Sequence, residues 1–218
     1  MPALKIHLHY QPRDLSDRFA MLMTRLLRGI SDVFFVKRYG HRAVVLETVA
    51  AVPGMVGATL NHLKCLRTMT GDHGWIRALM NEAENERMHL MTFVAIAKPT
   101  LFERLLVLTA QWVFYCGFFG LYLISPRTAH RLVGYFEEEA IKSYTAYLEE
   151  LEEGRADDVP APKIARDYWQ MAPEARLSDV VRLVRQDEMH HRDTNHHFAD
   201  ELTGRAPLRQ AGTDPRHG

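Results

Sequence analysis

The stretch Arg185-Gln186-Asp187-Glu188-Met189-His190-His191-Arg192-Asp193-Thr194-Asn195-His196-His197 holds four of the twelve histidines of this 218-residue chain. Its apolar residues recur with the helical period, and we expect the helix to run from about Leu177 to Leu202. Residues three apart on a helix project from one face, and Glu188 and His191 both fall on the apolar stripe. The helical phase therefore selects Glu188 and His191 as candidate ligands of a buried site.

The other polar residues of this stretch fit the apolar stripe less well. Asp187 and His190 lie about 100° round the helix from the two candidate ligands, so we expect Asp187 behind the site. The remaining imidazoles are assigned to polar surface or to the surroundings of the ligands: His190, His196 and His197.

A second Glu-x-x-His motif, Glu86-Arg87-Met88-His89, lies on the apolar stripe of another helix, and Glu47 and Glu137 occupy stripe positions on two more. One such motif occurs by chance in many proteins. The order Glu, Glu-x-x-His, Glu, Glu-x-x-His on four long helices is the ligand pattern of ferritin-like di-iron and di-manganese proteins. We therefore predict a two-metal site inside a four-helix bundle. Further glutamates are assigned to solvent or to the surroundings of the site: Glu82, Glu84, Glu138 and Glu139.

The charges of these candidate ligands favour a pair of metal ions. Four buried carboxylates without a counter-ion would cost many kcal/mol or would become protonated. Two divalent cations balance four negative charges. Oxygen and imidazole ligands suit iron or manganese, and the absence of cysteine from the set argues against structural zinc.

The fold class is all-α, because helical periodicity dominates the chain and no stretch alternates polar and apolar residues between hairpin turns. We expect six long helices, four in a ferritin-like bundle and two at a membrane surface. Residues 154–173, with three prolines and one glycine, are expected to form an irregular loop. We predict a single domain over residues 1–203 and a disordered tail over 204–218. The expected helices are Leu15–Lys37, His41–Met69, Gly74–Ala97, Leu101–Ile124, Thr128–Glu153 and Leu177–Leu202.

Two of these helices have unusual sequences. Pro53 lies inside the second, where proline removes a backbone hydrogen bond and predicts a kink. The fourth carries residues 105–125 without one charge, and at the helical rise this stretch extends about 31 Å, the thickness of a bilayer core.

The composition excludes several classes of protein. Lysine plus arginine and aspartate plus glutamate balance at 27 each, so the charge predicts no nucleic-acid partner. Two cysteines, Cys65 and Cys116, are too few for a disulfide framework and indicate a reducing compartment. The first twenty residues show neither a secretory signal nor a transit peptide.

Four stretches of the chain resemble the four motifs of the alternative oxidases, the cyanide-insensitive ubiquinol oxidases. They are residues 46–55, 85–90, 137–140 and 187–193. The resemblance implies a homodimer that oxidises two ubiquinols while it reduces one dioxygen to two waters, without proton pumping. It also implies a centre of two iron ions ligated by Glu47, Glu86, His89, Glu137, Glu188 and His191.

The resemblance assigns further site residues. Tyr144 matches a tyrosine beside the metals and is expected to be a redox-active donor, with Asp187 beside it in the catalytic set. Arg42 matches the arginine that contacts the quinone headgroup. Phe136 and Ser143 stand where the family usually has leucine and threonine, and both are expected to line the quinol pocket. Positions around the site or pocket are matched by Asn85, His130, Tyr168 and Trp169, while Met189 replaces the usual alanine.

The uncharged fourth helix predicts contact with a lipid bilayer. A single span would place the third and fifth helices on opposite sides of the membrane, although both must supply ligands to one site. We therefore expect this helix to lie in one leaflet beside the first helix, which makes the protein monotopic. The compact length, without the regulatory cysteine extension of plant members, is typical of bacterial members. This favours the cytoplasmic face of a bacterial inner membrane, or the matrix face of the mitochondrial inner membrane if the chain is organellar.

Two other functions remain open from the residues. One is a soluble di-iron peroxidase, hydroxylase or iron-storage subunit, against which the uncharged helix argues. The other is a membrane-associated scaffold without catalysis, which would leave four stripe carboxylates without a purpose.

Overall fold

The computed structural model describes residues 9–34, 39–97 and 100–207, and seven helices lie in this part of the chain. Six are long, which confirms the predicted all-α fold, and their described ends lie within two residues of the expected ones. The expected end of the first helix at Lys37 and the tail from residue 208 lie outside the described residues. The helices are α1 (Leu15–Phe34), α2 (Tyr39–Thr68), α3 (Trp75–Ala97), α4 (Leu101–Ile124), α5 (Pro126–Glu152), α6 (Lys163–Tyr168) and α7 (Leu177–Glu201).

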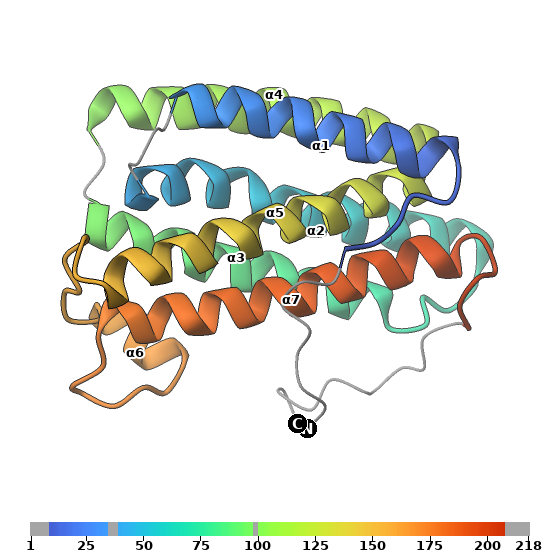
Figure 1. The fold of residues 1–218 in the computed structure, drawn as a ribbon. Coiled ribbons are helices and arrows are strands. Elements are labelled where there is room, and N and C mark those ends of the chain that lie inside the picture. The colour runs from blue at the N-terminus through green and yellow to red at the C-terminus, as the bar shows by residue number, and fades with distance from the viewer. Residues whose placement is uncertain (1–8, 35–38, 98–99, 208–218) are drawn as a thin grey trace.

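Four of the long helices form a bundle. Helix α2 packs along α3, and α5 packs along α7 (Figure 1). Helices α1 and α4 lie on one side of this bundle, at the top of the view, where α1 contacts α5 and α4 contacts both α2 and α5. The loop expected over residues 154–173 contains the short helix α6, which contacts α3.

Helices α2 and α3 approach closely because Gly54 has no side chain. A Cβ at this position would come within 2.4 Å of the Leu79 carbonyl oxygen and 3.0 Å of the Ala83 Cβ atom. Pro53, where we expected a kink, lies inside α2, and the helix continues to Thr68. The close packing holds Glu47, about two turns before Gly54, against the helix that carries Glu86.

A buried ion pair ties α1 to the bundle. Arg131 of α5 and Asp17 of α1 are both 0% exposed, and Arg131 Nε donates to Asp17 Oδ1 over 3.1 Å. The same guanidinium donates to Nδ1 of His196 over 2.9 Å, so it also reaches α7. Breaking such a pair on one side typically costs about 3–5 kcal/mol, because a buried charge is left alone. The pair therefore fixes α1 along α5.

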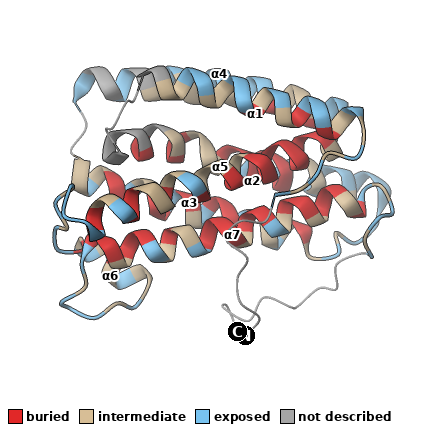
Figure 2. Cartoon of the chain, in the orientation of Figure 1, coloured by how far each residue is buried: buried red, intermediate tan, exposed pale blue. Residues whose placement is uncertain are grey.

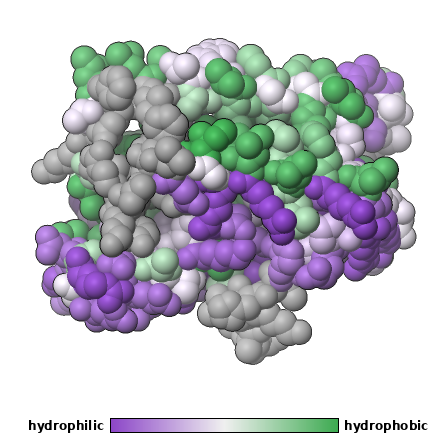
Figure 3. Space-filling view, turned by 45° about the horizontal axis from the view of Figure 1, so that its top comes forward, coloured by the Kyte–Doolittle hydropathy of each residue, from purple (hydrophilic) through white to green (hydrophobic). Residues whose placement is uncertain are grey.

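The bundle and the two outer helices differ in exposure. Buried residues concentrate on the inner faces of α2, α3, α5 and α7 (Figure 2). Hydrophobic residues gather on the upper part of Figure 3, over α1 and α4, and hydrophilic residues on the lower part. Residues Val107–Ile124 of α4 are long and apolar enough to cross a membrane, yet only 11% of this window is buried. Both outer helices expose apolar side chains. They include Phe19, Leu22, Leu26 and Ile30 on α1 and Leu108, Trp112 and Val113 on α4.

Candidate metal centre

The six candidate ligands from the sequence meet inside the bundle. Each helix of the bundle supplies at least one of them, and none is more than 5% exposed. Ligand atoms of Glu47, Glu86, His89 and Glu188 all lie within 4.8 Å of one another. His191 joins through Glu86, and Glu137 lines the same cavity as Glu188.

The two histidines direct the same ring atom at the carboxylates. Nδ1 of His89 lies 3.5 Å from Glu47 Oε2, 3.4 Å from Glu86 Oε2 and 3.3 Å from Glu188 Oε1. Nδ1 of His191 lies 2.6 Å from Glu86 Oε1. One Glu-x-x-His motif comes from the α2 and α3 pair and the other from the α5 and α7 pair. The cluster therefore has the two-fold character of a two-metal site.

Several buried atoms of this cluster have no hydrogen-bond partner of acceptable geometry. They are Glu47 Oε2, both carboxylate oxygens of Glu86, His89 Nδ1 and His191 Nδ1. Burying such atoms without a partner is costly, and a protein seldom does so for several atoms in one place. Oxygen and imidazole donors that face one another in this way fit a pair of metal ions, and the cluster is compatible with a metal site.

Asp187 determines which ring nitrogen of His89 faces the cluster. Its Oδ2 lies 3.4 Å from His89 Nε2 and accepts hydrogen bonds from Asn85 Nδ2 and Trp169 Nε1 over 3.1 and 3.0 Å. The pKa of Asp187 is raised by burial and lowered more by His89 and these donors, so the group stays a carboxylate. A carboxylate only accepts, hence Nε2 carries a proton and Nδ1 is the ring atom that faces the cluster, where it can bind a cation once it has lost its own proton.

The pKa shifts reflect an excess of negative charge in a dry space. Burial, followed by the charge of Glu86, raises the pKa of Glu47 well above its usual range. Burial raises the pKa of Glu86, but the charges of His89 and His191 lower it by more, so the pKa lies well below its usual range. Burial lowers the pKa of His191, but the charge of Glu86 prevails and raises it to about 9. Positive charge from protons or from cations therefore stabilises the cluster.

Tyr144 lies beside the cluster, as the sequence predicts. Its hydroxyl donates to Glu47 Oε1, and its ring stacks on Phe93 with 5.7 Å between centroids. Burial, followed by the charge of Glu47, raises the pKa of Tyr144 well above its usual value. The phenol is therefore held in its protonated form next to a candidate ligand.

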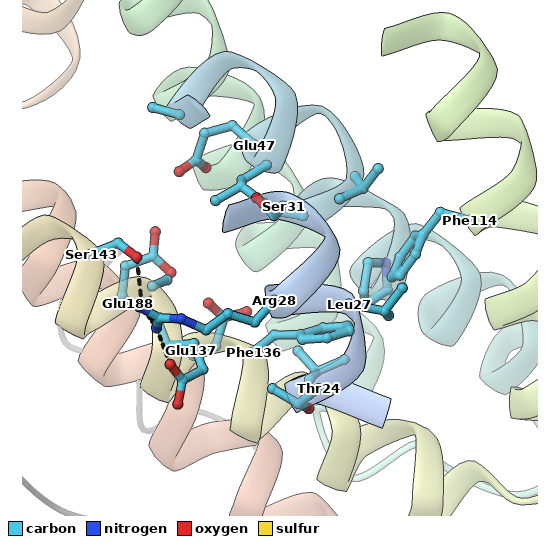
Figure 4. Close-up of a pocket in the computed structure, with 18 of the residues that line it drawn as sticks. Thr24, Leu27, Arg28, Ser31, Glu47, Phe114, Phe136, Glu137, Ser143 and Glu188 are labelled. Carbon is cyan, nitrogen blue, oxygen red and sulfur yellow. Dashed lines mark hydrogen bonds and ion pairs between the residues drawn. The ribbon is translucent and has the colours of Figure 1, made fainter. Parts of the chain in front are cut away.

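A cavity of about 440 Å³ opens beside the cluster and is lined mainly by apolar side chains from α1, α2, α4 and α5. Phe136 and Ser143, two of the three predicted pocket residues, both line it. In Figure 4, Phe136 and Phe114 lie together on the side away from Ser143 and Glu188. Their ring centroids are 6.0 Å apart. The side chain of Arg42, the third predicted pocket residue, lies outside the described residues.

Sequence reasoning missed one contact in this cavity and left open whether two further glutamates are buried. Arg28 of α1 lines the cavity (Figure 4). It forms an ion pair with Glu139, which was expected at the surface or around the site. Glu82 and Glu138 are each 4% exposed and therefore belong to the interior. The position of Glu82 on the apolar stripe of α3 was the signal for its burial. Nothing local signals the Arg28 pair, because its partner is 111 residues away.

Known proteins are similar in sequence to most of this chain. The family model described as "Alternative oxidase" matches residues 4–200. "Ubiquinol oxidase 2, mitochondrial" of Glycine max is 55% identical over 203 residues, which cover 93% of this chain and 61% of that protein. "Ubiquinol oxidase, mitochondrial" of Mangifera indica is 54% identical over 93% of this chain and 64% of its own length. "Ubiquinol oxidase 1c, mitochondrial" of Arabidopsis thaliana is 56% identical over 88% and 58%.

The chain spans about three fifths of the length of these curated relatives. The matched part contains the whole cluster, the cavity and all six long helices except the last residue of α7. Because the family model covers most of the sequence and the relatives are more than half identical over the matched residues, the chain belongs to the alternative oxidase family.

Proposed function

We propose that the chain is a ubiquinol:oxygen oxidoreductase, a terminal oxidase that is insensitive to cyanide and pumps no protons. The single observation that carries this proposal is a buried Glu and His cluster, with polar atoms left without partners, that borders an apolar cavity. A soluble iron-storage or hydroxylase subunit needs no exposed apolar helix of the kind that covers this cavity. The names of the relatives support the same substrate.

We propose that two iron ions are held by the six clustered side chains. The donor set fits iron, and two divalent cations would neutralise the four carboxylates. When bound, the iron pair supplies the redox chemistry between quinol and dioxygen. The ligands are Glu47, Glu86, His89, Glu137, Glu188 and His191.

The protein itself orients the quinol, excludes water from the cavity and holds protons at defined atoms. The apolar walls of the cavity exclude water from the quinol ring. Ser143 donates its hydroxyl proton to the Glu139 carbonyl over 2.9 Å, so its oxygen is free to accept from a quinol hydroxyl. Tyr144 holds a phenolic proton at Glu47, between cavity and cluster, and we propose that it is the redox-active donor. Two quinols supply the four electrons and four protons that convert dioxygen to two waters, so the reaction requires no proton from outside.

The activity is tested by oxygen uptake in membranes supplied with ubiquinol, with and without cyanide. Glu86→Ala and Glu188→Ala should abolish the cyanide-resistant uptake. Glu84→Ala is the matched control, because Glu84 is exposed on the same helix and binds only Arg87 among the contacts found for it. Uptake that persists in both cluster variants contradicts the proposal. Metal analysis of the wild-type protein should give about two irons per chain, and stoichiometric zinc would contradict an iron centre.

We also propose that Arg42 binds the quinone headgroup, since an arginine donates strong hydrogen bonds to a polarised oxygen. Arg42→Ala should weaken quinol affinity while both irons stay bound. Loss of iron from this variant would show that Arg42 supports the metal centre instead.

The protein is proposed to lie on one face of the membrane, the cytoplasmic face in a bacterium or the matrix face in a mitochondrion. Helices α3 and α5 flank α4 in the chain and lie in the same bundle, which supports a position of α4 within one leaflet (Figure 1). Leu22→Glu with Leu26→Glu should weaken binding to lipid vesicles, because both side chains are more than half exposed on α1. Protease protection that places the two termini on opposite faces would refute this topology. A homodimer is proposed as well, and light scattering in detergent tests it.

A further inference from the structure

A chain of hydrogen bonds crosses the bundle one turn away from His191. Asn195 of α7 stands at its centre and is 1% exposed. Its Nδ2 lies 3.0 and 2.9 Å from the two carboxylate oxygens of Glu82 on α3, and 3.0 Å from the His191 carbonyl oxygen. Its Oδ1 lies 2.9 Å from Nδ1 of His130 on α5. One side chain thus joins three helices of the bundle.

The direction of each bond follows from the partners. The carboxylate of Glu82 and the carbonyl of His191 accept hydrogen bonds, so the amide nitrogen of Asn195 must face them and its oxygen must face His130. His130 Nδ1 therefore carries the proton, and burial lowers the pKa of His130 to about 4, which keeps the ring neutral. Nε2 is then the acceptor.

The outer half of the chain agrees with this assignment. The hydroxyl of Tyr122 on α4 lies 3.0 Å from His130 Nε2, and its oxygen accepts from Asn61 Nδ2 over 3.0 Å. The phenol therefore donates its proton to Nε2. Every bond from Asn61 to Glu82 donates in the same direction, so no member of the chain conflicts with its neighbour.

The chain lies where it can control the position of His191. Asn195 is one helical turn beyond His191 on α7, and Glu82 is one turn before Glu86 on α3. His191 Nδ1 and Glu86 Oε1 are 2.6 Å apart. The bonds between Asn195 and Glu82 therefore tie α7 to α3 next to this pair. Asp187 orients the other histidine, His89, and is not a member of this hydrogen-bond chain.

We propose that Asn195, held by Glu82 and His130, is a positioning residue for His191 and determines how tightly one ion of the pair is bound. This inference rests on the proposed two-iron centre. Loss of such an outer partner typically lowers metal affinity by roughly 10–100-fold. The effect should be confined to the ion bound by His191.

The test follows iron release from the purified full chain after anaerobic loading with ferrous ion, with a chelator as acceptor. Asn195→Leu keeps the volume but breaks the hydrogen bonds to all three partners. It should release one iron per chain roughly 10–100-fold faster than the wild-type protein, while the second iron is released at the wild-type rate. Val184→Ala is the control, because it opens a space at a fully buried position of the same helix. It lowers the stability of the protein but removes no member of the hydrogen-bond chain.

Two variants of His130 separate the two halves of the hydrogen-bond chain, because each keeps the bond on one side of the ring. The amide of His130→Asn replaces Nδ1 and keeps the donor to Asn195. The amide of His130→Gln replaces Nε2 and keeps only the acceptor for Tyr122. The proposal expects wild-type iron release from His130→Asn and fast release of one iron from His130→Gln. If Asn195→Leu does not fold, Glu82→Gln, which keeps an acceptor, and Glu82→Leu, which does not, provide the same contrast.

The outcomes separate the two proposals. The positioning role is overturned if Asn195→Leu releases both irons at the wild-type rates. It is also overturned if Asn195→Leu loses both irons equally fast and Val184→Ala, with the same melting temperature, does so too. Either result leaves the two-iron centre intact. A wild-type chain that takes up no iron overturns the proposed function itself, and this inference with it.

Discussion

His89 and Asp187 lie 98 residues apart in the chain, yet Nε2 of His89 is 3.4 Å from Oδ2 of Asp187. This contact turns Nδ1 of His89 toward the three nearest carboxylates of the cluster. Each Glu-x-x-His motif is thus supported by a residue outside the motif, Asp187 for one and Asn195 for the other.

Replacing Asp187 by asparagine should weaken the iron centre. The amide removes the charge that fixes the protonated Nε2, so both iron affinity and oxygen uptake should fall by roughly 10–100-fold. Chelator competition and oxygen electrodes measure the two effects. Asp193→Asn is the control, since the Asp193 side chain is 51% exposed on the same helix. Unchanged affinity in Asp187→Asn would show that the tautomer of His89 is set elsewhere.

Tyr144→Phe should retain two irons but lose turnover. The variant keeps the ring that stacks on Phe93 and removes only the hydroxyl that donates to Glu47. Loss of a positioned proton donor typically costs about 100-fold or more in rate. Tyr115→Phe on α4 serves as the control. Wild-type oxygen uptake by Tyr144→Phe would exclude a redox-active or proton-donating role.

Phe136→Leu should raise the KM for ubiquinol about fivefold with kcat unchanged. The leucine removes an aromatic surface of the cavity, worth about 1 kcal/mol against a bound ring. Phe119→Leu, which changes a ring on α4 that does not line the cavity, should leave KM unaltered. Steady-state oxygen uptake at varied quinol concentration distinguishes them. A fall in kcat alone would place Phe136 outside the binding step.

Two glycine variants should change stability in opposite directions. A Cβ at Gly134 of α5 would lie 2.4 Å from Nδ1 of the buried His196 ring, so Gly134→Ala should cost about 1–3 kcal/mol through overpacking. A Cβ at Gly117 of α4 meets nothing within 4 Å, so Gly117→Ala should stabilise the helix by about 0.5–1 kcal/mol. Thermal unfolding in detergent measures both. If Gly134→Ala melts at the same temperature as the wild-type protein, the His196 ring moves aside freely.

His130 should make the protein sensitive to acid. Burial lowers its pKa from 6.5 to about 4 in the folded state, so the unfolded chain binds the extra proton first. The contribution of the neutral ring to stability is full above pH 6.5 and is lost as the pH falls toward 4, by about 3 kcal/mol. Urea unfolding of the metal-free protein at pH 7 and pH 4.5 should show a smaller loss in His130→Asn. An equal loss in both proteins would assign the acid sensitivity to other groups.

Much of the fold follows from local pattern. Apolar residues with the helical period locate six long helices, and ionisable residues on the apolar stripes identify the cluster, because a charge on such a stripe requires a buried partner. Prolines and glycines locate the loop before α7, although not the short helix α6 within it.

The sequence by itself determined which side chains converge, since helical phase is set by neighbours three and four residues away. Only the tertiary structure decided which ring nitrogen faces the cluster, that Arg28 pairs with Glu139, and that Glu82 is buried against Asn195, 113 residues further along the chain. The physical reason is distance along the chain. Burial and hydrogen bonding of a polar side chain depend on partners that only the packing of the helices brings within 3 Å.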